Sequence, residues 1–98
     1  MYLIEFGSRA ERDKKLLKSA GLESKAKFLL NIIAVNPFQT PPPYEKLLGD
    51  LRGNLSRRIN IQHRLVYDVR DNTECLTDAG GKLYDGIIRI KRMWSHYE

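Results

Sequence analysis

The hydrophobic residues of this chain change their spacing at a proline-rich segment near its middle, and that change decides the fold class. Before residues 37–43, which read Pro-Phe-Gln-Thr-Pro-Pro-Pro, apolar residues recur at the three- and four-residue intervals of a helix. After this segment they alternate with polar residues, as in strands that are buried on one face. Consecutive prolines exclude regular structure, so we expect a stiff connector between a helical and a sheet-forming part.

The front part predicts one strand and two helices. Residues 2–6 are rich in strand formers and read as a strand. Ser8 and Glu11 have the spacing of a capping box, which predicts a first helix over about 9–20. A second helix is expected over 23–35, because the following Asn-Pro pair stops it. The short link between the helices predicts an antiparallel hairpin.

The rear part predicts strands. Leu65, Tyr67 and Val69 alternate with Arg64 and its in-phase neighbours, so the two sets should face opposite sides of a sheet. Trp94 is expected in phase with the apolar residues of the last strand. We expect strands at residues 55–61, 63–69 and 87–94, and a polar, glycine-bearing excursion at 73–86 with a short ladder near 75–76.

The order of these segments predicts an α+β fold. A helical hairpin should pack on one face of a twisted, mostly antiparallel sheet. Residues 44–50 are expected to form only an irregular turn. The length of 98 residues suits a single domain, 1–98. The sheet face that carries Arg64 is left for solvent or a ligand.

Composition narrows the class of partner and the cellular compartment. The net charge of +5 suits a polyanionic partner, and seven of the nine arginines follow residue 51. The single Cys75 excludes an internal disulfide, and one Cys with two His is too few for a structural zinc site. No stretch is long and apolar enough to predict a signal peptide or a membrane span, so a cytoplasmic protein is expected.

The sequence contains no motif for a nucleotide, a flavin or a metal. RNA cleavage is a reaction that side-chain acid, base and cation alone can perform, because the 2′-hydroxyl of RNA is the nucleophile.

Several segments carry a specific resemblance. They are Pro-Phe at 37–38, Leu-Ser-Arg-Arg-Ile at 55–59, His-Arg-Leu-Val-Tyr at 63–67 and Ser-His-Tyr at 95–97. Together they resemble the YoeB/Txe toxins of bacterial toxin–antitoxin modules, within the RelE-like superfamily. The resemblance implies a helical hairpin on a twisted antiparallel sheet. It also implies an endoribonuclease that enters the ribosomal A site, cuts mRNA without a metal or cofactor and stops translation.

The resemblance also assigns roles to residues. Glu45 falls on the general base, Arg64 on the cation that holds the scissile phosphate, and His96 on the general acid. Tyr97 is expected to stack on a base or orient the phosphate. Supporting RNA contacts are expected from Arg58, Lys46, Arg57 and Arg92.

The resemblance implies partners. These are the ribosome, mRNA and a small, acidic, partly disordered antitoxin of the YefM/Axe type, with a homodimer as a further candidate. The chain departs from the family at Glu98, which follows the Tyr that commonly ends these toxins, and at Leu48, where relatives carry a lysine.

Other interpretations remain open from the residues. The chain could be a non-catalytic inhibitor of the ParE-like, gyrase-binding type, or a plain RNA-binding module. Taken singly, Arg64 could also be a solvated strand residue or the ion-pair partner of Asp68.

Overall fold

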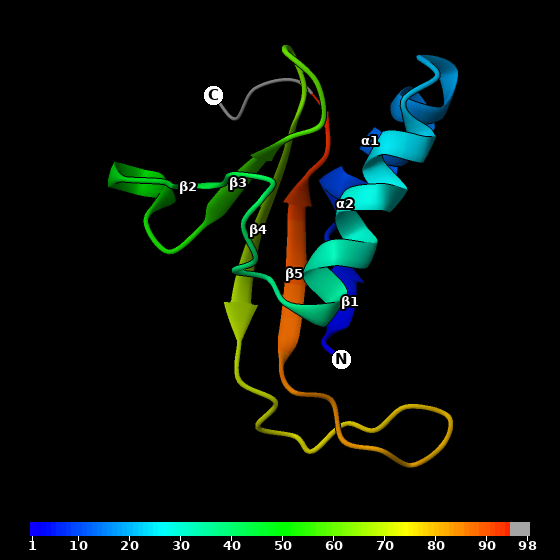
Figure 1. Ribbon diagram of the computed structural model, residues 1–98, viewed down its shortest axis with the longest axis vertical. Helices are drawn as coiled ribbons and strands as arrows, with labels where there is room; N and C mark the ends of the chain where they lie inside the picture. The colour runs from blue at the N-terminus through cyan, green and yellow to red at the C-terminus, as the bar shows by residue number, and fades with distance from the viewer. Residues whose placement is uncertain (95–98) are drawn as a thin grey trace.

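The computed structural model describes residues 1–94 and has the α+β architecture that the sequence predicts (Figure 1). Two helices follow the first strand, and the remaining strands come after the proline-rich connector. In chain order the elements are β1 (Leu3–Phe6), α1 (Ser8–Ser19), α2 (Glu23–Val35), β2 (Glu45–Lys46), the 3₁₀ turn η1 (Gly49–Leu51), β3 (Leu55–Arg58), β4 (Arg64–Arg70) and β5 (Ile87–Arg92).

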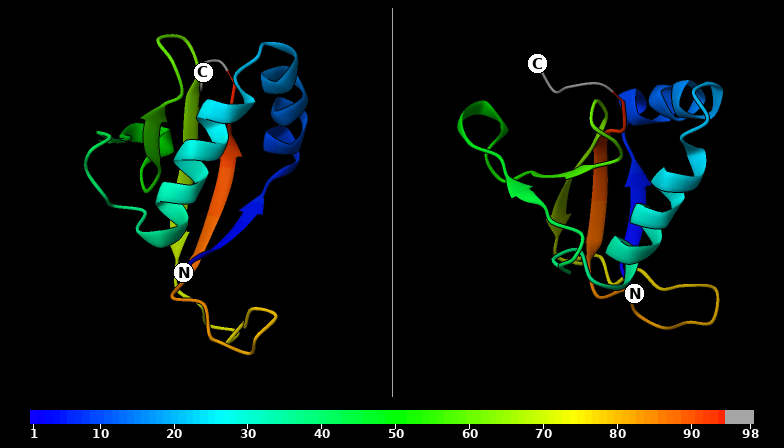
Figure 2. Two further views of the ribbon diagram at one scale, coloured as in Figure 1. Left: turned by 45° about the vertical axis from the view of Figure 1, so that its right-hand side comes forward. Right: turned by 45° about the horizontal axis from the view of Figure 1, so that its top comes forward.

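The strands form one sheet in the order β1-β5-β4-β3-β2. All neighbours are antiparallel except β1 and β5, which are parallel, so the prediction of a mostly antiparallel sheet is confirmed. Both helices lie on the same side of the sheet (Figure 2). The opposite side, called the open face below, carries neither α1 nor α2.

The core lies between the helices and the sheet. Leu65 and Tyr67 of β4 are fully buried, as their alternation with Arg64 predicts. Leu17 and Ile33 of the helices are buried against the same layer. Burying each such side chain contributes roughly 1.5–3 kcal/mol.

The start of α1 differs from the predicted capping box. Ser8 is already helical, and Gly7 occupies the N-cap with no side-chain cap hydrogen bond. The Gly7 N–H donates to the Ile90 carbonyl at 2.9 Å, which extends the sheet pairing up to the helix. Glu11 binds Lys14 at 3.1 Å instead of closing a box.

A β-bulge changes the phase of β5. Val66 pairs with Arg92 while Tyr67 pairs with Ile90, so Lys91 is the extra residue. The shift buries Met93, which is 2% exposed, where the unbroken alternation predicted Trp94. Trp94 therefore falls out of phase with Ile88 and Ile90, because an alternating pattern gives no sign of the inserted residue, although its side chain is still partly buried against the core.

Two other segments are more ordered or shorter than expected. Glu45–Lys46 pairs with β3 instead of lying in an irregular turn, and Leu47 N–H adds a bond to Asn54 at 3.0 Å. The ladder of the excursion is a single bridge between Thr77 and Leu83. Within the described residues, no helix has the length and apolar character that a membrane crossing needs.

Candidate functional site

The strand register places Glu45 and Arg64 on the open face. Glu45 is opposite Ser56, and Ser56 is opposite Val66, so the three form a row across β2, β3 and β4. Arg64 precedes Val66 by two residues and therefore projects from the same face. Neighbouring strands are about 4.8 Å apart, which puts the backbone of Glu45 roughly 10 Å from β4. The Ser56 hydroxyl between them is buried and has no hydrogen-bond partner in the described part of the chain.

Two arginines meet directly across the β3–β4 ladder. Arg58 is opposite Arg64, and like charges at opposed positions destabilise a sheet. An anion bound by both guanidinium groups would turn this repulsion into attraction. Arg58 is exposed and also borders a groove of about 370 Å³ beside α2.

The ion pair between Arg64 and Asp68, one of the alternatives left open by the sequence, is not formed. The Asp68 carboxylate binds Arg70 at 3.1 Å and Lys91 at 3.4 Å. Across residues 1–94, Arg64 has no acidic partner. Its charge is therefore available to a ligand.

The chain beyond β5 begins beside Arg64. The Arg64 backbone N–H donates to the Trp94 carbonyl at 2.9 Å. The Trp94 ring stacks on His63 with 3.8 Å between ring centroids and 17° between planes. His96 and Tyr97, the predicted acid and its neighbour, lie outside the described residues.

Arg57 does not have the surface position that an RNA contact requires. It is 1% exposed, and its Nε donates to the Tyr67 hydroxyl at 2.9 Å. Its two Nη atoms donate to carbonyl oxygens of the connector, at Pro37 (3.0 Å), Gln39 (2.8 Å) and Pro42 (2.6 Å). The prediction of an RNA contact by Arg57 is wrong, because a proline-rich segment has carbonyls that no strand or helix satisfies and this guanidinium binds them.

Arg57, the connector carbonyls that it binds and the buried Tyr67 hydroxyl form one hydrogen-bonded cluster. The Tyr67 hydroxyl donates to the Pro37 carbonyl at 2.8 Å. Burial raises the pKa of Tyr67, although the Arg57 hydrogen bond and charge act against the rise. The cluster fixes the connector that leads directly into Glu45.

The raised pKa of Tyr67 has a consequence for alkaline stability. The unfolded chain ionises this phenol near its ordinary pKa of about 10 before the folded chain does, so the stability it contributes is lost as pH rises above that value. We expect Tyr67→Phe to have a shallower fall of the unfolding free energy between about pH 9 and 11 than the wild type, by up to about 1.4 kcal/mol per pH unit. Urea titrations at several pH values would measure this difference; parallel curves would contradict it.

Lys46 and Arg92, two of the predicted RNA contacts, are not placed as free cations on the open face. Lys46 is opposite Leu55, a core residue, so it projects from the face opposite to that of Glu45, although it is exposed. Arg92 lies on the open face, but its Nε binds buried Asp13 at 2.9 Å. Asp13 also accepts the Met93 N–H at 2.9 Å, so this pair fixes the end of β5 to α1.

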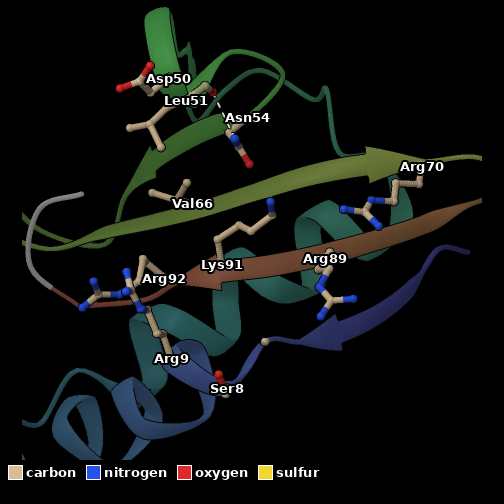
Figure 3. Close-up of a pocket in the computed structure, with 11 residues that line it drawn as sticks. Ser8, Arg9, Asp50, Leu51, Asn54, Val66, Arg70, Arg89, Lys91 and Arg92 are labelled. Carbon is tan, nitrogen blue, oxygen red and sulfur yellow. Dashed lines mark hydrogen bonds between the residues drawn. The ribbon is translucent and has the colours of Figure 1, made fainter. Parts of the chain in front are cut away.

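A cleft of about 750 Å³ continues the open face beyond Val66 (Figure 3). Strands β4 and β5 form its floor, and its walls are the start of α1 and the segment around η1. Among the described residues, Asp50 is the single acidic one that lines it. Its cationic lining residues are Arg9, Arg70, Arg89, Lys91 and Arg92.

Most of these cations were missed as site residues by the sequence analysis. The richness in arginine of the rear half was visible, but the bulge that brings Lys91 and Arg92 together is not. Arg9 reaches the cleft from the other end of the chain, through the parallel pairing of β1 with β5. Within residues 1–94, no group of three or more His, Cys, Asp or Glu could hold a metal.

Comparisons with known proteins assign the sequence to a family. The model of the YoeB-like toxin of bacterial type II toxin–antitoxin systems matches residues 6–79. Toxin YoeB of Synechocystis sp. is 44% identical over 61 residues, which are 62% of this chain and 64% of that toxin. Toxin YoeB of Streptomyces coelicolor is 39% identical over 70 residues, which are 71% of this chain and 76% of that one.

The fold is shared with solved structures over almost the whole chain. The YoeB–YefM complex and the YoeB dimer of Staphylococcus aureus superpose with TM-scores of 0.72 and 0.71. Sequence identity is 32% and 31%, and the matches cover 99% and 98% of both chains. Since sequence and fold agree over most of its length, this chain belongs to the YoeB-like toxin family of bacterial type II toxin–antitoxin systems.

Proposed function

We propose that this toxin is a ribosome-dependent endoribonuclease that cuts mRNA in the A site and so inhibits translation. The observation that carries the proposal is that Arg64, without an acidic partner among the described residues, shares the open face with Glu45. Arg58 lies opposite Arg64, so two cations are available to one phosphate. The Arg64 backbone N–H donates to the Trp94 carbonyl, so the last described residue, two positions before His96 in the sequence, lies beside Arg64.

The proposed reaction is a transesterification within the RNA. Glu45 takes the proton of a 2′-hydroxyl, and the 2′-oxygen attacks the adjacent phosphorus. Arg64 binds the phosphoryl oxygens on which negative charge develops. His96 donates a proton to the departing 5′-oxygen, leaving a 2′,3′-cyclic phosphate and a free 5′-hydroxyl. Tyr97 stacks on a base or orients the phosphate.

The proposed partners follow from the family. The Staphylococcus aureus relative was solved with YefM and as a dimer. We propose that this chain likewise binds a small acidic antitoxin, that it can pair with a second copy, and that it acts in the cytoplasm. Acidic antitoxin residues would compete with RNA for the cationic open face.

A bacterial translating extract tests the proposal. Addition of the toxin should truncate a reporter mRNA at positions within the ribosomal A site, mapped by primer extension. The same RNA without ribosomes should stay intact or be cut far more slowly, because the ribosome aligns the strand. Uncut mRNA with inhibited DNA supercoiling would establish the ParE-like alternative. Uncut but bound mRNA would establish the RNA-binding module.

The acid and base roles predict opposite changes in pH dependence. Glu45→Gln and His96→Gln should each slow ribosome-bound cleavage by about 10²-fold. The Glu45 variant should lose the acidic limb of the rate profile, and the His96 variant the basic limb. Single-turnover cleavage rates across pH measure both limbs. If either variant had the same pH–rate profile as the wild type, that residue would have no role in proton transfer.

The double variant provides a further check. Residues that act in one step have effects that do not add. Glu45→Gln combined with His96→Gln should therefore slow cleavage by less than the product of the two single effects. A coupling energy near zero would contradict the shared step.

A further inference from the structure

We infer that the cleft beyond Val66 is a second phosphate site, in which Arg9 and Arg89 bind the RNA backbone away from the cleaved nucleotide (Figure 3). The inference rests on the proposed function for its ligand, a single RNA strand. It concerns two residues to which the proposed reaction gives no role.

The other cations that line the cleft already form ion pairs with acidic residues. Asp68 binds both Arg70 and Lys91, and Asp13 binds Arg92. These three cations are therefore partly neutralised and held in place in the free protein.

Arg9 and Arg89 differ from them. Neither has an ion pair within the described residues. Glu5 is level with Arg89 in the β1–β5 register, yet no ion pair joins them. Both arginines are exposed, and they come from different elements that line one cleft. Two unmatched guanidinium groups that share one cleft indicate an anionic ligand.

The position of Arg9 strengthens this interpretation. It lies in the first turn of α1, where the helix dipole is positive and a cation is unfavourable. Gly7 and Ser8 line the same cleft, and the N-cap Gly7 has no side chain to bind the first N–H groups of the helix. An anion in the cleft would relieve the repulsion of Arg9 and could accept hydrogen bonds from the same end of the helix.

The register separates this site from the scissile phosphate. Arg89 is opposite Asp68, which follows Arg64 by four residues on β4. At about 3.3 Å per residue, the two backbone positions are roughly 13 Å apart along the sheet. Arg64 and Arg89 thus suit different phosphates of one strand.

RNA fits the cleft better than an acidic peptide does. An amphipathic peptide helix needs an apolar groove, but Leu51 and Val66 are the only large apolar side chains among the described residues lining this cleft. Val66 and Arg92 also belong to the row that leads to Glu45, so a strand bound there passes directly into the proposed active site.

The salt dependence of RNA binding tests the inference. The probe is a fluorescent single-stranded oligoribonucleotide with 2′-O-methyl groups, which cannot be cleaved by 2′-attack. Each phosphate contact on a single strand contributes about −0.7 to the slope of log K against log salt. Arg9→Ala/Arg89→Ala should therefore flatten the slope by about 1.4 relative to the wild type.

A matched control removes the same charge elsewhere on α1. Arg12 and Lys18 are exposed and do not line the cleft. Arg12→Ala/Lys18→Ala should keep the wild-type slope, and circular dichroism should show both double variants folded. The slope measures the binding of a strand that cannot be cleaved, so failure of the proposed cleavage would be visible separately in the extract assay.

Two results would overturn the inference. One is an equal slope for the wild type and Arg9→Ala/Arg89→Ala, or an equal loss in the control. The other is a double variant that binds RNA normally but loses binding to a poly-glutamate peptide, which would make an acidic protein the ligand of the cleft.

Discussion

Replacing Arg57 by Met is expected to lower the free energy of unfolding by about 3 kcal/mol. The change keeps most of the side-chain volume but removes the donors to Gln39 and Pro42 and one of the two donors to Pro37, whose carbonyl keeps its bond from the Tyr67 hydroxyl. Each of the two partly buried carbonyls left without a donor costs up to about 1–3 kcal/mol, while the removal of a buried charge offsets part of that sum. For a domain of this size, the melting temperature should fall by more than about 10 °C. Urea denaturation measures the free energy directly.

Two variants make this prediction specific. Arg58→Met is the matched control, since Arg58 is the next residue and is exposed; its stability should stay within about 0.5 kcal/mol of the wild type. The free energy of unfolding of Arg57→Lys should fall between those of the two Met variants. An ammonium group keeps the charge but cannot donate to several separate carbonyls with the planar geometry of a guanidinium. If Arg57→Met and Arg58→Met had equal free energies of unfolding, the hydrogen bonds from Arg57 to the connector would not contribute to stability.

Arg57 also links the core to the proposed active site. The connector that it binds ends at Pro43 and is followed by Tyr44, whose ring centroid lies 5.0 Å from the guanidinium carbon. Glu45 comes next, on the edge strand β2. Arg57 is therefore a positioning residue for the proposed base, and it acts through the connector without contacting substrate.

The features that the sequence predicted well are those set by local periodicity. The alternation of Leu65 and Tyr67 with Arg64 is reproduced in β4. In a strand that is buried on one side, the polarity of each residue indicates which face of the sheet it occupies. Helix α2 has the bounds that its apolar spacing and the following Asn-Pro pair predict. The order of helices and strands then leaves one sheet face open.

The features that could not be predicted depend on partners far away in the chain. Asp13 binds Arg92 across 79 positions, and Arg57 binds Pro37 across 20. A buried charged side chain resembles a surface one in a hydrophobic pattern, so Arg57 was predicted to contact RNA. The bulge at Lys91 changes the face of every later residue without any local signal.

Arg64→Ala is expected to slow mRNA cleavage on the ribosome by about 10²–10³-fold, the usual loss when a group that stabilises transition-state charge is removed. The fold should survive, because Arg64 projects from the open face and forms no ion pair among residues 1–94. Its backbone bond to Trp94 does not depend on the side chain. Single-turnover cleavage and the urea midpoint together separate a lost contact from a lost fold.

Arg64→Lys should recover only part of the rate. Lysine restores the charge, but an ammonium cannot bind two phosphoryl oxygens with the paired N–H groups of a guanidinium. Arg12→Ala removes one charge from the exposed surface of α1 and should cut at the wild-type rate. Full recovery by lysine would reduce the role of Arg64 to general electrostatic attraction. The proposed site binds the scissile phosphate between Arg64 and Arg58, which are opposite each other in the strand register. Cleavage by Arg64→Ala at the wild-type rate would therefore place the active site elsewhere.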